Sequence, residues 1–483
     1  MDSGIRDVRF AVIAMLLLAA TMSAHAATIT VTNTNDSGPG SLRQALAVAH
    51  DGDRITFAVS GTITLTSGGL VVTKNITISG PGANQLSIDG NPGTVVFSVD
   101  TSATIATISG LTIRNGVHGI VTFGTLTVSN CVVSGNSAVG IASAGGTLTV
   151  SNCIVSGNSN GITNNGHSLT VANCNVSDNG QSGISFTAPD FVVVTATIRS
   201  TTVSGNLAGG IIANVGGFGI TLQVTITDCT ISGNSGYGGI HAEGIPSLTV
   251  INSTISGNSA NAGQGRGGGI HAANGLTVEN SSISGNSAAT SGGGIYGGAT
   301  VVNSTISGNS AGTSGGGIYN NSGLHLENST IAGNSAGSGG GIYNEEDDLV
   351  EISNTILKAG ASGENIFNDG GTVTSLGYNL SSDDGGGYLT GPGDQINTDP
   401  LLGPLQDNGG PTLTHALLPG SPAIDAGDPN FSPPPSTDQR GCHFDRVFNG
   451  RIDIGSFETQ PPPRRPCPTP RPRPSPLPRP SPH

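Results

Sequence analysis

The chain has 483 residues, of which 77 are glycine and only 10% are charged, and it contains no tryptophan. The chain has 17 basic and 31 acidic side chains. Residues 27–458, which we call the body, hold 10 of the basic and 29 of the acidic side chains, so the body has a net charge of −19. Because nucleic-acid binding requires a basic stripe, we expect no nucleic acid among the partners of this body.

The first 26 residues have the features of an export signal. Arg6 and Arg9 supply positive charge, Phe10 to Met22 form an apolar run, and Ala24-His25-Ala26 matches the small-x-small cleavage pattern. The run is shorter than the roughly 20 apolar residues that a membrane-spanning helix needs. We therefore expect residues 1–26 to be removed on export, leaving a mature chain without a transmembrane segment.

Residues 27–60 are predicted to form an N-terminal cap. Ser41-Leu42-Arg43-Gln44 has the pattern of a capping box, which predicts a short helix from Leu42 to about Ala49. We interpret this helix as a lid over the first strands of a repeat domain, because a stack of strands exposes an open edge at each end.

Residues 61–370 are predicted to form one repeat domain. An isoleucine that follows glycines recurs nine times after Ile120, over 222 residues, at a mean interval near 24.7. Its positions are Ile120, Ile141, Ile162, Ile184, Ile211, Ile240, Ile270, Ile295, Ile318 and Ile342. A fixed period of this length is typical of a solenoid, in which each repeat stacks on its neighbours and shares their core.

Within each repeat, apolar residues alternate with polar ones, which is the period of a strand. In Leu248-Thr249-Val250, for example, leucine and valine face inward and threonine faces outward. Three short strands separated by Gly, Asn and Ser turns fit one interval, whereas four strands do not. The sequence therefore predicts an all-β fold, a single-stranded parallel β-helix with three strands in each coil.

Two asparagine columns support this register. The first, at a corner between strands, comprises Asn130, Asn152, Asn173, Ser200, Asp228, Asn252, Asn280, Asn303, Asn328 and Asn354. The second comprises Asn136, Asn158, Asn179, Asn206, Asn234, Asn258, Asn286, Asn309 and Asn334. Asparagine tolerates left-handed turns, and its amide can bond to the amide one coil above. We interpret both columns as structural; glycan attachment at the N-S-T triplets is the alternative.

Several cysteines fall in one column directly after the first asparagine. Cys131, Cys153, Cys174 and Cys229 share the strand parity of inward residues, so we expect a buried column of small side chains. Stacked coils hold Cβ atoms about 4.8 Å apart, farther than a disulfide prefers, which favours thiols. No C-x-x-C pair or repeat histidine accompanies them, so we expect no zinc.

The residue after the column isoleucine is the most suggestive surface feature. In five successive repeats it is aromatic: His241, His271, Tyr296, Tyr319 and Tyr343. Its parity is opposite to that of isoleucine, so these rings are predicted to lie outside, along one face. Such a column is a candidate ligand-binding strip for sugar rings or a partner surface. The alternative is that the rings stabilise the stack by contacting one another.

Residues 371–458 lose the repeat register and are predicted to form a C-terminal cap module. The module contains Asp425, Asp428, Asp438, Arg440, Asp453 and Glu458. We favour a structural role, with Asp438 and Arg440 as an ion pair that fixes the cap. Calcium is the alternative, although the spacing matches no EF-hand loop. Residues 459–483, rich in proline and arginine and carrying Cys467, are predicted to be an unpacked tail.

The I-S-G-N-S-A and G-G-G-I-Y units resemble the right-handed parallel β-helix repeats of bacterial surface proteins, including the polymorphic outer-membrane proteins. The front segment Gly40-Ser-Leu-Arg-Gln-Ala45 and the back segment Gly420-Ser-Pro-Ala-Ile-Asp-Ala-Gly427 are similar to those of secreted β-helix proteins with a C-terminal anchoring-type module. The resemblance implies a right-handed, pectate-lyase-like superfold at the bacterial cell surface or outside the cell. Proteins of this kind include adhesins and enzymes.

An enzymatic alternative has few candidate residues. Polysaccharide lyases of this superfold need clustered carboxylates for calcium and a basic residue, and the repeats offer only Lys74, Lys358, Arg266 and the acidic run Glu345–Asp348. Glycoside hydrolysis needs two carboxyls roughly 5–9.5 Å apart. Glu279 and Glu327 share an outward column two coils apart, at about 9.6 Å, which is marginal.

The sequence thus favours an exported, non-catalytic β-helix that acts in adhesion or in binding of a glycan or protein partner. We predict no catalytic residue, no metal and no cofactor, and name the His241–Tyr343 column as the contact strip. A polysaccharide lyase or glycoside hydrolase working in a groove of the helix is the alternative, and a purely structural spacer is the third possibility.

Overall fold

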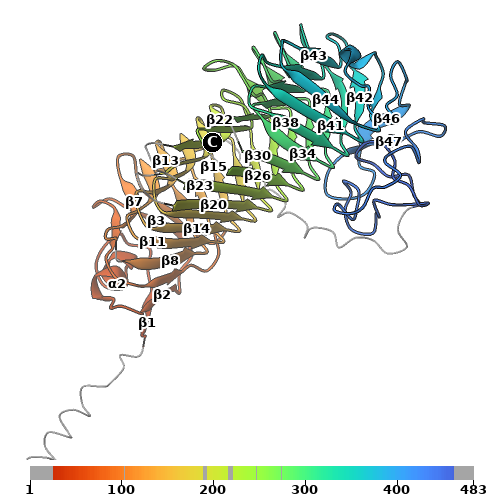
Figure 1. The fold of residues 1–483 in the computed structure, drawn as a ribbon. Helices are drawn as coiled ribbons and strands as arrows, with labels where there is room; N and C mark the ends of the chain where they lie inside the picture. Colours follow the sequence, from red (N-terminus) through yellow and green to blue (C-terminus); the bar gives the residue numbers. More distant parts are fainter. Residues whose placement is uncertain are drawn as a thin grey trace, which may run out of the picture.

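The computed structural model describes residues 26–461, except residues 103, 189–192, 216–220, 246 and 274. The predicted leader, apart from Ala26, and the tail from residue 462 onward with Cys467 lie outside the described residues. Within the described part, three strands in each coil stack into three parallel sheets that run along an elongated molecule (Figure 1). No helix in the described part is both long and apolar enough to cross a bilayer.

A complete coil contributes one strand to each sheet, so strands that neighbour each other within a sheet come from consecutive coils. The first sheet consists of β1 (Thr28–Val31), β2 (Arg54–Phe57), β5 (Thr77–Ser79), β8 (Ile105–Ser109), β11 (Thr125–Ser129), β14 (Thr147–Ser151), β17 (Ser168–Ala172), β20 (Val193–Arg199), β23 (Thr221–Thr227), β26 (Ser247–Ile251), β30 (Leu276–Glu279), β34 (Ala299–Val302), β38 (Leu324–Glu327), β41 (Leu349–Ser353) and β44 (Thr372–Gly377). The second sheet consists of β4 (Leu70–Val72), β7 (Val95–Val99), β10 (His118–Thr122), β13 (Val139–Ser143), β16 (Asn160–Asn164), β19 (Ser182–Ala188), β22 (Gly209–Val215), β25 (Ile240–Glu243), β29 (Ile270–Ala272), β33 (Ile295–Tyr296), β37 (Ile318–Asn320), β40 (Ile342–Asn344) and β43 (Ile366–Asn368). The third sheet consists of β3 (Gly61–Thr64), β6 (Leu86–Asp89), β9 (Thr112–Arg114), β12 (Val132–Ser134), β15 (Ile154–Ser156), β18 (Asn175–Ser177), β21 (Thr202–Ser204), β24 (Thr230–Ser232), β27 (Thr254–Ser256), β31 (Ser282–Ser284), β35 (Thr305–Ser307), β39 (Thr330–Asn334), β42 (Ile356–Ala359) and β45 (Leu380–Ser381).

The remaining elements are short. A fourth parallel ribbon comprises β28 (Ser259–Ala260), β32 (Ser287–Ala288) and β36 (Ser310–Ala311); an antiparallel pair comprises β46 (Leu402–Gln406) and β47 (Thr414–Leu417); and the helices are α2 (Leu42–Val48) and the 3₁₀ turn η2 (Gly385–Gly387).

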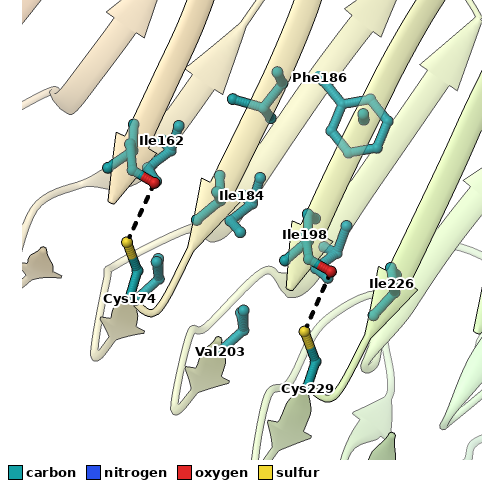
Figure 2. Packing of buried hydrophobic residues seen from close by; sticks show 14 of the residues in the cluster. Ile162, Cys174, Ile184, Phe186, Ile198, Val203, Ile226 and Cys229 are labelled. Atoms are coloured by element: carbon teal, nitrogen blue, oxygen red, sulfur yellow. Dashed lines mark hydrogen bonds between the residues drawn. The ribbon is translucent and has the colours of Figure 1, made fainter. Parts of the chain in front are cut away.

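The register follows the predicted columns. Ile120 pairs with Ile141 and Ile141 with Ile162, and the column continues to Ile342 and on to Ile366. Inward isoleucine, leucine and valine from all three sheets fill the interior, as Figure 2 shows around Ile184 and Ile198. The predicted parallel β-helix with three strands in each coil is confirmed.

Both asparagine columns are confirmed, with different roles. Residues of the first column have left-handed backbone, with φ between 45° and 55° from Asn130 to Asn354. Residues of the second are buried, and from Asn136 to Asn309 each amide nitrogen donates to the amide oxygen of the next coil, as Asn258 does to Asn286 at 2.9 Å. The cysteine column is also buried; Cys229 Sγ donates to the carbonyl oxygen of Ile198 (Figure 2).

Strand pairing extends beyond the predicted limits of the repeat domain. It begins at Thr28 rather than residue 61 and continues to Ser381 rather than residue 370. The predicted helix is present as α2, with Ser41 Oγ accepting from the backbone nitrogen of Gln44, and it packs against β1 and β4 near the first coils.

The C-terminal residues 401–461 lie along the outward face of the third sheet at its last coils (Figure 1). Thr305 Oγ1 donates to Gln439 Oε1 at 2.6 Å, and Ser307 Oγ lies 2.8 Å from His415 Nε2. A small second core joins Ile356 and Leu380 of the sheet to Ile454 and Phe457. This segment therefore covers the flank of the solenoid.

Candidate functional site

The predicted aromatic column exists and is longer than the sequence indicated. We call the seven rings the aromatic ladder: Tyr237, His241, His271, Tyr296, Tyr319, Tyr343 and Phe367. Successive ring centroids are 4.6–5.2 Å apart, because the residues from His241 to Phe367 pair in register along the second sheet. The structure brings together all five predicted residues.

Two members of the ladder were missed. Phe367 follows Ile366, one further interval of 24 residues after Ile342, so the period could have revealed it. Tyr237 lies three residues before Ile240, a position at which the following repeats have glycine, and it forms an isolated β-bridge with Ala260.

The rings contact one another face to face in the second half of the ladder. The Tyr296 and Tyr319 planes differ by 12°, those of Tyr319 and Tyr343 by 7°, and those of Tyr343 and Phe367 by 21°. Because the faces are occupied by neighbouring rings, a ligand approaching from the side meets ring edges and hydroxyls. The ladder is thus both a stabilising stack and a strip of polar edges.

Glycine-rich loops allow the chain to fold closely over the ladder. A Cβ at Gly292 would lie 2.7 Å from Tyr296 Cβ, and one at Gly267 would lie 2.6 Å from His271 Cβ. Both glycines have positive φ, a conformation that other residues rarely adopt. As a result Tyr296 is only 6% exposed, while His241, His271, Tyr319 and Tyr343 are half-buried, not fully exposed on a flat face.

Polar groups line the edge of the ladder. The Arg266 guanidinium lies 4.8 Å from the Tyr296 ring centroid, and Asn321 Nδ2 donates to Tyr296 Oη at 3.4 Å. Tyr343 Oη donates to Asp369 Oδ2 at 2.5 Å. The charge of Glu345 acts on Tyr296 and Tyr319, so Arg266 and the acidic run at Glu345 both lie near the ladder.

The ladder is electrically neutral near pH 7. Burial lowers the pKa of His271 to about 4, with the charges of His241 and Arg266 acting in the same direction. Burial likewise lowers the pKa of His241. Burial raises the pKa of Tyr319 to about 12, helped by the nearby charge of Glu345. The imidazoles are therefore neutral and the phenols protonated, so the strip offers both hydrogen-bond donors and acceptors.

A second feature lies on the first sheet, in a shallow groove of about 290 Å³ whose lining includes Gly298, Gly323, His325 and Glu351. His325 Nδ1 is 3.6 Å from Glu351 Oε2, and its Nε2 is 3.8 Å from Glu327 Oε2. Pairing places Glu279 two coils from Glu327, with Val302 between them, as predicted. The sequence analysis did not select His325, although the alternation in Leu324-His325-Leu326 predicts that its side chain points outward.

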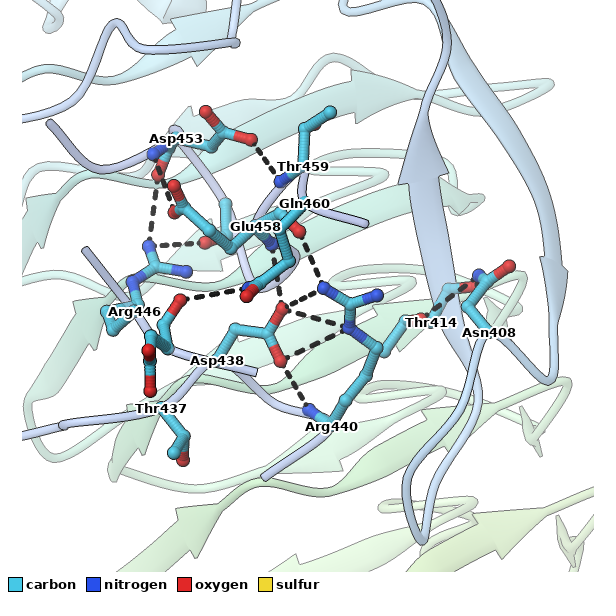
Figure 3. A network of polar contacts seen from close by, with 12 residues as sticks. Asn408, Thr414, Thr437, Asp438, Arg440, Arg446, Asp453, Glu458, Thr459 and Gln460 are labelled. Atoms are coloured by element: carbon cyan, nitrogen blue, oxygen red, sulfur yellow. Dashed lines mark hydrogen bonds and ion pairs between the residues drawn. The ribbon is translucent and has the colours of Figure 1, made fainter. Parts of the chain in front are cut away.

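In the C-terminal segment the predicted ion pair is present. Arg440 Nη2 lies 2.5 Å from Asp438 Oδ2, and both side chains are almost fully buried (Figure 3). The Arg440 guanidinium also stacks between the Phe444 and Phe457 rings, at 3.7 and 3.8 Å from their centroids. These contacts fit the structural role proposed for the pair.

No curated protein matches this sequence. Among solved structures, the A-module of a mannuronan C-5 epimerase from Azotobacter vinelandii is similar at 15% identity and a TM-score of 0.49, covering 71% of this chain and 97% of that one. A pectate lyase is similar at 15% identity and a TM-score of 0.39, covering 90% and 97%. The catalytic domain of an α-1,3-glucanase is similar at 16% identity and a TM-score of 0.42, covering 72% and 69%.

The right-handed beta helix region family matches residues 94–244 and 188–344, which together span more than half of the 483 residues. The matched range contains the coils that carry the ladder from Tyr237 to Tyr343. The strand order, the register and this match agree, and the chain belongs to the right-handed beta helix family.

Proposed function

We propose that the protein is an exported β-helix that binds a polysaccharide or a glycan-bearing partner along the aromatic ladder, at a cell surface or in secreted form. The observation that carries the proposal is the ladder itself, a repeating row of ring edges and hydroxyls with one ring on each of six successive strands. A row of chemically similar groups at a constant spacing suits a ligand that is itself repetitive.

The polar edge favours a sugar over a purely apolar partner. Tyr319 and Tyr343 hydroxyls, Asn321 and the carboxylate of Asp369 offer hydrogen bonds of the kind that sugar hydroxyls make. Arg266 adds a cationic group beside Tyr296, which favours glycans that carry some carboxylates. Export rests on the predicted leader, and adhesion is the consequence we propose for such binding outside the cell.

The test separates the hydroxyl from the ring. Tyr319→Phe keeps the stacked ring and removes the hydroxyl, so retention on immobilised polysaccharides should fall several-fold while the melting temperature stays near that of the wild type. Tyr378→Phe, which removes a hydroxyl outside the ladder, is the matched control. If no polysaccharide in a panel of neutral and acidic glycans retains the wild type, the proposal is wrong.

A second candidate function is glycoside hydrolysis in the groove on the first sheet. It is favoured by one observation, the placement of His325 between the Glu327 and Glu351 carboxylates at 3.8 and 3.6 Å. Two carboxyl groups on either side of a substrate can act as general acid and general base. Release of reducing ends by the wild type, lost in both Glu327→Gln and Glu351→Gln but kept in Glu279→Gln, would establish it.

A further inference from the structure

The C-terminal segment holds more buried carboxylates than its arginines neutralise. Asp438 and Arg440 form a buried ion pair, and Arg440 Nη2 also donates to the Glu458 carbonyl oxygen. Arg446 is fully buried, but its Nη2 donates to Asn328 Oδ1 and to the main-chain oxygens of Asp453 and Gly455 (Figure 3). Its Nη2 thus holds main-chain segments together, whereas its Nε and Nη1 have no hydrogen-bond partner among the described residues.

Three other carboxylates meet beside this pair. One oxygen from each of Asp425, Asp453 and Glu458 lies within 4.8 Å of one oxygen from each of the others. Asp453 and Glu458 are at most 1% exposed, whereas Asp425 is exposed at the mouth of the cluster. Among the described residues, none of the three has an ion-pair partner within 4.0 Å.

The hydrogen bonds of the cluster leave one buried oxygen unsatisfied. Asp453 accepts from the backbone nitrogens of Asp425 and Thr459, and Glu458 Oε2 accepts from the backbone nitrogen of Asp453. In the described part of the chain, Glu458 Oε1 has no hydrogen-bond partner. An unpartnered buried carboxylate oxygen destabilises the folded chain unless a proton or a cation compensates it.

We propose that Asp425, Asp453 and Glu458 bind a calcium ion. Calcium prefers hard oxygen ligands at about 2.3–2.6 Å, so two oxygens on the same ion lie at most about 5 Å apart, which accommodates the spacing of these three. The exposed Asp425 gives the ion a route from solvent, and water molecules there complete its coordination.

Burial and the charge of Asp453 act against ionisation of the cluster when no ion is bound. Burial raises the pKa of Glu458 to about 8, and the Asp453 carboxylate acts in the same direction. The nearby charge of Arg446 opposes a cation and favours modest affinity, in the range of roughly 10⁻⁴–10⁻³ M at which extracellular modules bind calcium. A bound ion would tie the 453–459 segment, which contacts Asn354 of the solenoid through Gly455, to the loop at Asp425.

The experiment is thermal unfolding of the mature chain, stripped with a chelator and then titrated with calcium chloride to about 5 mM, with isothermal calorimetry on the same samples. The wild type should gain several degrees and show one binding event. Asp425→Asn, at an exposed position, should fold normally and lose most of that gain, and Glu458→Gln should lose it entirely. Asp407→Asn, an exposed aspartate of the same segment outside the cluster, should keep it.

Either of two results would overturn the calcium site. The first is a wild type whose melting temperature and calorimetric trace do not respond to calcium, which would mean that Glu458 is compensated by a proton. The second is an undiminished response in Asp425→Asn, which would place the ion elsewhere. If Glu458→Gln fails to fold, Asp425→Asn with its control decides the question alone.

Discussion

Within one repeat, two asparagines six residues apart stabilise the coil in different ways. Asn252 turns the chain at a left-handed φ of 49°. Asn258 is buried; its amide nitrogen donates to Asn286 Oδ1 and to the Ile231 carbonyl, and its amide oxygen accepts from the backbone and side chain of Asn234. The first role depends on backbone conformation and the second on hydrogen bonds.

This difference predicts that two substitutions change the free energy of unfolding by very different amounts. Asn258→Ala removes the partner of two buried groups, the backbone nitrogen of Asn234 and the carbonyl oxygen of Ile231, at about 1–3 kcal/mol each, so the free energy of unfolding should fall by at least about 2 kcal/mol. Asn252→Gly, the control, should stay within about 1 kcal/mol of the wild type because glycine adopts the same φ. Urea unfolding measures both, and equal losses would contradict separate roles.

His271 makes the ladder sensitive to acid. Its pKa in the folded chain, about 4, lies below the ordinary 6.5, so the unfolded chain binds the proton more readily. The stability that neutral His271 contributes is therefore complete above pH 6.5 and is lost as the pH falls from 6.5 towards 4.

His271→Tyr should reduce this acid sensitivity, because tyrosine already occupies the next position of the ladder and does not titrate in that range. We expect the melting temperature of the wild type to fall more steeply than that of the variant between pH 6.5 and 4. Parallel curves for the two proteins would show that His271 does not contribute.

At the scale of strands and sheets, the sequence predicts what the repeat period controls. Alternation and period together identified the inward isoleucines, both asparagine corners and the five ring positions, because neighbouring coils must align the same positions. The period could not predict that Gly292 and Gly267 bring loops close over the rings, since burial depends on loop packing. The period also could not predict that Tyr237 joins the ladder, because the corresponding position of the following repeats is glycine.

The repeat period also could not predict where the C-terminal segment docks. Thr305 is outward by parity, like Thr254 two coils earlier, yet it is 0% exposed because Gln439 and Ser456 cover it. Nothing in the repeat distinguishes a covered threonine from an exposed one. The contact joins residues more than 130 positions apart, which local patterns do not encode.

Thr305→Arg should displace this segment from the third sheet. An arginine side chain has no room in the buried contact, so limited proteolysis should cut within residues 401–461 much faster than in the wild type while the solenoid stays resistant. Thr254→Arg, in the same column but only half-buried, is the control and should leave the cleavage rate unchanged. Equal rates for Thr305→Arg and the wild type would show that the contact does not hold the segment.

At the scale of the whole molecule, a stack in which each coil contacts mainly its neighbours has a stability set by coil–coil interfaces. The buried thiols report on those interfaces. Cys131, Cys153 and Cys174 lie on three successive coils, and Cys229 lies two coils beyond Cys174. Cys442, in the C-terminal segment, is partly exposed.

Thiol labelling followed by mass spectrometry should therefore give two classes of site among the five cysteines of the described residues. Cys442 should react within minutes in buffer, whereas the four column thiols should be protected and become reactive only as denaturant opens the stack. Because these coils share one continuous core of isoleucine, valine and leucine, and each interface couples one coil to the next, we expect all four to become reactive over the same range of denaturant. If Cys229 is labelled at a clearly lower denaturant concentration than Cys131, the solenoid instead opens coil by coil, beginning with the coils nearer to the ladder.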